Sequence, residues 1–189
     1  MGFIYQTSIE VMDGFSSQWG FSWSDVGANT AGSLLFLSQQ LAWKQQRIQF
    51  KFSFHNTPYA KYRPALLGEN YSQHIFKDYN GQTYWLSTNI YSFLPSSSQF
   101  PKWLNISLGY GAEGMTGANQ NPLIVNGNSI PSFQRYRQFY LSPDIDLTKI
   151  KLRSPLLRTI FQTIGFIKFP APAIEYNTKG KVKFRAFYF

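Results

Sequence analysis

With 189 residues and no cysteine, the chain can bury the core of one domain but can form neither a disulfide framework nor a thiolate metal site. Aromatic residues make up 19% of the chain and charged residues only 14%, where an ordinary soluble domain has roughly 25% charged residues. This balance suits a protein at an apolar–polar boundary, although a large and well-filled soluble core is the alternative explanation.

The first predicted element is a short helix over 3–12, which Gly14 ends. The chain opens in apolar residues without a cap. It has no signal-peptide pattern, and Gln6 stands where N-myristoylation requires Ser or Thr. No run reaches the roughly 18 apolar residues that a membrane-spanning helix needs. Because a natural domain rarely begins in this way, we expect an upstream portion of the protein to be missing.

A second, longer helix is predicted over 25–46, after an aromatic loop. Ser22 and Asp25 have the spacing of a capping box, with Asp in the position usually held by Glu. Small residues in the first half of this helix leave room for the close approach of another helix. We therefore expect Asp25 to cap the helix and Asn29 to be buried against the first helix, so that 1–46 form a helical segment.

Four polar side chains lie beside or within these apolar helices: Glu10, Asp13, Asp25 and Asn29. Polar groups in such settings are costly unless they are paired, so they mark either a helix–helix contact or a site. If the helices pack antiparallel, the cluster could hold a cation or keep one carboxyl group protonated. Alternatively, the aspartates cap helices and Asn29 bonds between them. No catalytic motif is complete, so we assign no catalytic residue, no metal and no cofactor.

The remainder, 47–189, is predicted to form an antiparallel, aromatic-rich sheet region, which gives an α+β fold with the helices. Alternation with period two places Phe50, Phe52 and Phe54 on an apolar layer and Lys51 and Ser53 on a polar one, so we expect Lys51 not to point into the core. Further strands are predicted over 82–93 and 103–112, as one broken strand over 134–141 and 145–147, and as a hairpin over 173–189. The segments between them are predicted as a short helix over 69–79, a long loop over 114–133 and one further helix over 154–165.

About six strands are expected in this sheet, and the last one ends in Phe189 after an aromatic run. Such a terminal strand resembles the last strand of bacterial outer-membrane barrels, although the smallest of these have eight strands. The sheet could therefore be a partial or small barrel, or an open sheet that this strand closes at one edge.

The two histidines do not form a recognisable site. His55 ends a predicted strand on its polar side, and His74 lies in the short helix. Neither has a zinc-binding spacing or a catalytic partner nearby in the sequence. We interpret both as ordinary exposed or hydrogen-bonded side chains.

Basic residues are concentrated near the C-terminus. Nine Lys and Arg residues lie between 149 and 189 against one acid, Glu175, in a chain with a formal net charge of +9. Such a segment favours anionic partners, and the candidate contacts with anionic lipid are Lys179, Lys181, Lys183 and Arg185. Alternatively, these residues only solubilise an edge strand. No nucleic-acid-binding module is recognisable, so we expect no nucleic-acid partner.

The N-terminal pattern resembles the YfiM-like family, whose members are predicted periplasmic lipoproteins of unknown function in Gram-negative bacteria. The residues that carry the pattern are Glu10, Asp13, Trp19, Ser22, Asp25, Asn29 and Gly32. Segments further along, such as KDYNGQTYWLS, FPKWLN and GYGAEGM, are similar to the longer members. Members normally begin with a secretion signal and further helices, whose Asp-Lys and His would complete the polar cluster.

The resemblance implies a protein of the bacterial cell envelope that is associated with the periplasmic face of the outer membrane or inserted in it. Our first hypothesis is a non-enzymatic protein whose partners are membrane lipid or an envelope protein, with no small-molecule partner that the sequence identifies. The alternative is a lipid-modifying or hydrolytic envelope enzyme that uses Glu10, Asp13 and Asp25.

Overall fold

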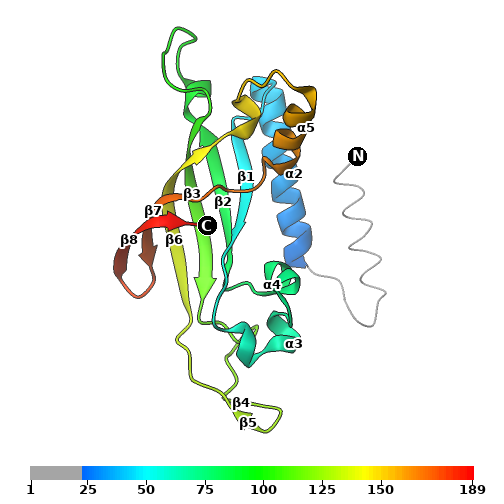
Figure 1. Ribbon diagram of the computed structural model, residues 1–189, viewed down its shortest axis with the longest axis vertical. Helices are drawn as coiled ribbons and strands as arrows, with labels where there is room; N and C mark the ends of the chain where they lie inside the picture. The colour runs from blue at the N-terminus through cyan, green and yellow to red at the C-terminus, as the bar shows by residue number, and fades with distance from the viewer. Residues whose placement is uncertain (1–22) are drawn as a thin grey trace. The chain divides into compact units, whose positions relative to one another are not determined.

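The computed structural model describes residues 23–189, and the chain divides into two compact units, Met1–Arg47 and Ile48–Phe189 (Figure 1). The fold is α+β, as predicted. The predicted first helix, with Glu10 and Asp13, lies outside the described residues, so the N-terminal helical pair stays a prediction. Within residues 23–189, no helix combines the length and the apolar character that crossing a membrane requires.

In the described part of the first unit, helix α2 runs from Trp23 to Trp43. It ends three residues before the predicted boundary, because Lys44 adopts a left-handed conformation, with φ 53°, that reverses the chain. The returning segment is tied to the buried Gln39, whose Oε1 accepts from Arg47 N at 2.8 Å and whose Nε2 donates to Gln46 Oε1 at 3.0 Å. Asp25 is the third helical residue.

In the second unit, six antiparallel strands form one sheet in the order β1-β2-β3-β6-β7-β8 (Figure 1). Their bounds are Ile48–Phe54, Gln82–Asn89, Leu104–Glu113, Tyr136–Ile145, Ala171–Asn177 and Lys181–Tyr188. Each strand pairs with the next strand of the sheet along the chain, as the predicted alternation requires. The predicted loop 114–133 is not wholly irregular, since it contains a two-stranded hairpin of β4, Ile124–Val125, and β5, Asn128–Ser129.

Short helices connect the strands: η1 Ala60–Tyr62, α3 Pro64–Leu67, α4 Tyr71–Lys77, η2 Ile90–Phe93, η3 Leu147–Lys149 and α5 Pro155–Ile164. The helices predicted over 69–79 and 154–165 both form, as α4 and α5, whereas α3 was not predicted. Both longer helices begin at side-chain caps, where Asn70 Oδ1 accepts from Gln73 N at 3.0 Å and Ser154 Oγ from Leu157 N at 3.5 Å. These caps explain why the predicted boundaries of α4 and α5 are nearly right.

The predicted break between 141 and 145 is also wrong, since β6 is continuous through Pro143. Proline normally interrupts a strand because it lacks the backbone N–H that the ladder needs. Here β6 pairs with β7 only from Gln138 to Leu141, so Pro143 lies beyond the end of that ladder. Its missing N–H therefore removes no hydrogen bond from the β6–β7 ladder, and on the other side Pro143 still pairs with Ile106 of β3.

The sheet is strongly curled but is not a closed barrel. β2 and β8 are four positions apart in the sheet, which would separate them by about 19 Å if the sheet were flat. Instead, Tyr188 Oη lies 3.0 Å from Thr83 Oγ1, and the rings of Tyr188 and Trp85 are 6.1 Å apart. The free edge of β1 is bound by the segment after α5, where Phe52 N donates to Phe166 O at 2.8 Å and Lys168 N to Phe52 O at 2.9 Å.

The curl encloses the polar side of the sheet. Lys51, Ser53 and Ser87 are 0–2% exposed, whereas Phe50 is 58% and Leu108 62% exposed. Alternation in β1 is therefore confirmed, but the expectation that its polar layer lies outside the core is wrong. Among the described residues, the buried set contains more polar or charged side chains than apolar ones. The apolar part of this interior is small, and consists of Trp85, Tyr140, Ala173 and Tyr188.

A glycine in β3 makes room for the largest of these side chains. A Cβ atom added to Gly109 would lie 2.7 Å from the Trp85 ring, whereas one added to Gly111 would meet nothing closer than 3.4 Å. We expect Gly109→Ala to lower the free energy of unfolding by about 2 kcal/mol through overpacking. Gly111→Ala, on the same face of the same strand, is the control and should change it by less than half as much in urea unfolding. Equal effects would contradict the assignment.

Candidate functional site

The two faces of the sheet carry different chemistry, and strand register sorts the residues into rows across it. We call the enclosed side the inner face and the opposite side the outer face. The inner face consists mainly of small neutral polar residues and glycines, among which the few buried charged side chains of the strands are joined in ion pairs. Its buried ionisable side chains are Lys51, Asp144 and Glu175, to which Asp146 and Lys168 add from the flanking segments.

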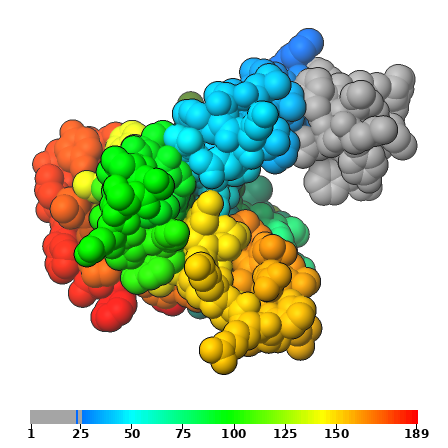
Figure 2. All heavy atoms as spheres, turned by 90° about the horizontal axis from the view of Figure 1, so that it is seen from above, coloured from blue at the N-terminus to red at the C-terminus, as the bar shows by residue number. Residues whose placement is uncertain are grey.

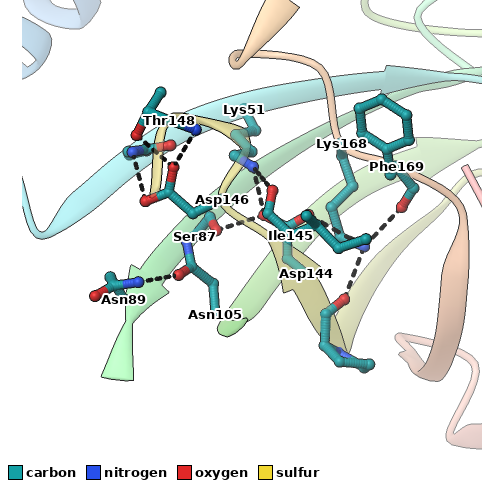
Figure 3. A network of polar contacts seen from close by, with 12 residues as sticks. Lys51, Ser87, Asn89, Asn105, Asp144, Ile145, Asp146, Thr148, Lys168 and Phe169 are labelled. Carbon is teal, nitrogen blue, oxygen red and sulfur yellow. Dashed lines mark hydrogen bonds and ion pairs between the residues drawn. The ribbon is translucent and has the colours of Figure 1, made fainter. Parts of the chain in front are cut away.

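At the centre of the inner face, one carboxylate lies between two lysines (Figure 3). Asp144 Oδ2 is 2.8 Å from Lys51 Nζ and accepts from Ser87 Oγ at 2.5 Å. Lys168 Nζ is 3.9 Å from Asp144 Oδ1. All three charged side chains are fully buried, so their attractions are weakly screened. This group therefore links β1, β2, β6 and the segment after α5.

Backbone carbonyls complete the environment of both lysines. Lys51 Nζ donates to Ile145 O at 2.7 Å, and Lys168 Nζ donates to Pro143 O, Phe169 O and Ser142 Oγ at 3.0–3.1 Å. Burial lowers the pKa of Lys168 to about 8, which the Asp144 carboxylate opposes and the Lys51 ammonium reinforces. Every proton of the Lys168 ammonium has an acceptor, so this lysine is placed to hold the sheet together rather than to react.

The network continues toward the end of the sheet at which β1 begins. Asn105 Nδ2 donates to Ser87 Oγ at 2.9 Å, and Asn89 Nδ2 donates to Asn105 Oδ1 at 2.7 Å (Figure 3). Beside them, Asp146 accepts from Gln49 Nε2 at 3.1 Å and from Thr148 Oγ1 at 2.5 Å. The inner face at this end is thus filled with paired polar groups.

Toward the other end, the inner face is hollowed by a polar pocket of about 330 Å³, which His55, Glu113, Tyr140 and Arg185 help to line. Burial lowers the pKa of His55 below its usual value, although Glu113 and Asp78 act in the opposite direction. The imidazole is therefore neutral at pH 7. His55 Nδ1 and Tyr140 Oη are both buried and have no hydrogen-bond partner among the described residues.

The carboxylate of this pocket is already saturated. Glu113 accepts hydrogen bonds from Tyr59 Oη at 3.1 Å, from Gln138 Nε2 at 3.1 Å and from Tyr136 Oη. Burial and the Glu113 charge raise the pKa of Tyr59 to about 12. The three donors fix the orientation of the Glu113 carboxylate. In the described part of the chain, no group of three or more His, Asp or Glu could hold a metal ion.

The residues predicted to contact anionic lipid are spread over different environments. Arg185 lies on the inner face, where its Nη2 and Nε donate to Glu175 Oε2 at 2.9 and 3.0 Å. Lys181 and Lys183 are exposed on the same face of β8. Lys179 lies in the preceding turn, with its ammonium 3.7 Å from the centre of the Tyr136 ring. Their role in lipid binding stays a prediction, as does that of the N-terminal polar cluster.

Of the four residues in the predicted N-terminal cluster, the structure describes the two that belong to α2. Asn29 is half-buried in this helix, and Asp25 belongs to its first turn. Glu10 and Asp13 lie outside the described residues, so no site that combines all four can be evaluated. Sequence reasoning missed the Asp144 network and the pocket at His55 because their members come together only through strand pairing.

The outer face is the most unusual surface of this unit. One row, which we call the aromatic row, consists of Phe52, Tyr84, Tyr110, Phe139, Tyr176 and Val182. The adjacent row, the leucine row, consists of Phe50, Leu86, Leu108, Leu141, Ile174 and Phe184, which are 42–71% exposed. A third and shorter row follows with Ile48, Thr88, Ile106 and Pro143. None of these rows contains a charged side chain.

An apolar groove of about 420 Å³ deepens this face where β6 and β7 separate beyond Leu141. Pro143, Ile174 and Phe184 line it with other apolar side chains. An exposed apolar surface of this extent is uncommon on a soluble monomer and marks a contact with a protein or with a membrane.

Comparisons of the chain with models of protein families, with curated proteins and with solved structures gave no match.

Proposed function

We propose that this chain is a non-enzymatic protein of the bacterial cell envelope whose curled sheet contacts the hydrocarbon of a lipid bilayer through its outer face. The observation that supports this best is the inverted polarity of the sheet, which buries Lys51 and Asp144 and exposes Phe50 and Leu108. In water, this arrangement leaves apolar surface exposed, so it does not gain the free energy of apolar burial, which is the main force for folding. Against hydrocarbon, the same arrangement is favourable.

The order of the rows supports the same conclusion. Outer-membrane strands carry an apolar band that is flanked by aromatic residues at the membrane interface and enclose a polar interior. Here the aromatic row borders the leucine row, and beyond the aromatic row the exposed Arg137 marks the return to polar surface. The interpretation of the sheet as a partial barrel belongs to this proposal.

The length of the band favours shallow insertion over crossing. Along β3, the outer face is apolar from Leu104 to Tyr110, a distance of six residue steps or about 20 Å. Strand tilt shortens the projection of this distance on the membrane normal, whereas a spanning barrel needs a band of about 25 Å. We therefore propose that the sheet enters one leaflet. The resemblance to the YfiM-like family supports the periplasmic side of the outer membrane as its place.

Cysteine labelling tests the proposal, because the chain has no native cysteine. Single cysteines at Leu86, Leu108 and Leu141 on the outer face are compared with single cysteines at Lys181 and Lys183, which are exposed on the inner-face side of β8. With an environment-sensitive fluorophore and vesicles added, the outer-face labels should shift to shorter wavelength. Lipids with a quencher on the acyl chain should quench them at least threefold more than the inner-face labels.

Two results would contradict this proposal. If the outer-face labels stay accessible to an aqueous quencher in the presence of vesicles, lipid is not the contact. If they become protected without vesicles, in proportion to protein concentration, the outer face instead binds a second copy of the chain. Labels on the exposed Leu123, which lies outside the six-stranded sheet, provide the baseline for both readings.

A further inference from the structure

Helix α5 has an apolar stripe, and none of its residues is buried. Its apolar residues at 156, 157, 160, 161 and 164 have the spacing of one helix face. In a soluble domain this face would be buried, yet no residue of α5 is buried, and Leu156, Leu157 and Ile160 are 69%, 45% and 40% exposed. The hydroxyl groups of Thr159 and Thr163 donate back to helix carbonyls, which reduces their need for water.

The stripe of α5 continues into the outer face of the sheet. After the helix, Phe166 and Ile167 are 56% and 39% exposed, and the backbone here is bonded to Phe52 on the free edge of β1. Lys168, the next residue, turns into the inner face. Alternation therefore directs Ile167 to the same side as the outer-face residues of β1.

The segment around α5 is also strongly basic. Lys149, Lys151, Arg153 and Arg158 lie in or just before the helix, and the sequence contains no acid between Asp146 and Glu175. Within residues 23–189, none of these four forms an ion pair. Trp103 is 43% exposed at the same end of the sheet, where its carbonyl accepts from Asp146 N at 2.8 Å.

From this juxtaposition we infer that α5 lies in the membrane interface and that Lys149, Lys151, Arg153 and Arg158 bind the phosphate groups of anionic lipid headgroups. An amphipathic helix with a basic border has the features of such an interfacial helix, and interfacial Trp residues favour the same depth. The inference rests on the proposed function. It places the anionic-lipid contact at α5 instead of the β7–β8 hairpin, which projects on a different side of the molecule (Figure 2).

The test compares two variants of the full chain with equal loss of charge. The first replaces Lys149, Lys151, Arg153 and Arg158 with Gln. The second replaces the exposed lysines Lys77, Lys179, Lys181 and Lys183 with Gln. Flotation with phosphatidylcholine vesicles, with and without 30% phosphatidylglycerol, gives the partition coefficients. Each basic residue near an anionic surface contributes appreciably to binding, so the first variant should lose at least tenfold in its preference for anionic vesicles. The second should lose less than threefold.

A label at position 157 gives a second readout that does not depend on charge. A single cysteine at Leu157 should carry a probe that acyl-chain quenchers reach, whereas one at Gln162, on the other side of α5, should remain in the aqueous or headgroup region. Equal losses in the two charge variants, or equal quenching at 157 and 162, would overturn the inference. If the outer-face labels enter neutral vesicles but the two charge variants, or the labels at 157 and 162, behave alike, only the inference about α5 is refuted. If no label enters any vesicle, the proposed function fails as well.

Discussion

Replacing Asp144 with Asn is expected to lower the free energy of unfolding by about 3 kcal/mol. The change preserves shape but leaves Lys51 and Lys168 buried with neutral acceptors only. Removing one partner of a buried ion pair typically costs about 3–5 kcal/mol, because the remaining charge stays uncompensated. The lower end of this range applies, because Lys168, whose pKa is lowered to about 8, can lose its proton and so remove one of the two uncompensated charges.

Urea unfolding followed by circular dichroism measures this effect. Asp146→Asn is the matched control, because Asp146 is equally buried but accepts only from the neutral Gln49 and Thr148 side chains and from backbone N–H. It should cost about 1 kcal/mol. If both substitutions cost the same, the ion pairs do not carry the effect.

The pH dependence of the Asp144→Asn variant gives an independent check. The folded-state pKa of Lys168 lies below its unfolded value, so above the folded value the unfolded chain binds more protons than the native one, and stability rises with pH. Without Asp144, the folded-state pKa falls further, because the carboxylate that raises it is gone. The difference in free energy of unfolding between the parent chain and the less stable variant should therefore be smaller at pH 9 than at pH 7.

Period-two alternation predicted the strands well because it reflects backbone geometry, which is the same in water and in lipid. The prediction of which face of β1 is buried was wrong, because it assumed that water surrounds the protein and that apolar side chains therefore face inward. The sequence did contain a signal against it. Apart from Glu113 at the last position of β3, the polar inner-face positions of β2 and β3 are Thr83, Ser87, Asn89, Asn105 and Ser107, none of which is charged. A solvated face normally carries charge, so small neutral polar residues indicate an enclosed face.

The candidate sites could not be predicted because they depend on long-range register. Asp144 meets Lys51 only because β1, β2, β3 and β6 pair in one particular alignment, and residue 168 joins them through a parallel contact with β1. His55 likewise meets Tyr140 in the pocket only because the sheet curls. No local pattern around His55 distinguishes it from His74, whose Nε2 donates a local hydrogen bond to Gly68 O at 3.1 Å.

Replacing Leu108 with Arg is expected to weaken membrane binding roughly thirtyfold while the protein remains folded. Leu108 lies in the leucine row and is 62% exposed, so the guanidinium would have water around it in the free protein and hydrocarbon around it in the bound one. A basic side chain on the lipid face of a membrane sheet costs about 2–4 kcal/mol at the bilayer midplane and less near the interface. Shallow insertion places Leu108 between the midplane and the interface, so we expect a cost of about 2 kcal/mol.

Flotation with neutral vesicles measures the partition coefficient without any contribution from anionic lipid, so the added positive charge cannot compensate by binding headgroups. Leu123→Arg is the control, because Leu123 is similarly exposed at 59% but lies outside the six-stranded sheet. It adds the same charge and should change partitioning less than threefold. Unfolding in urea without vesicles should be nearly identical for both variants and the parent chain, since exposed substitutions usually change stability by less than about 0.5 kcal/mol. A loss of stability at Leu108 instead would mean that protein covers this face, and the lipid contact would have to be abandoned.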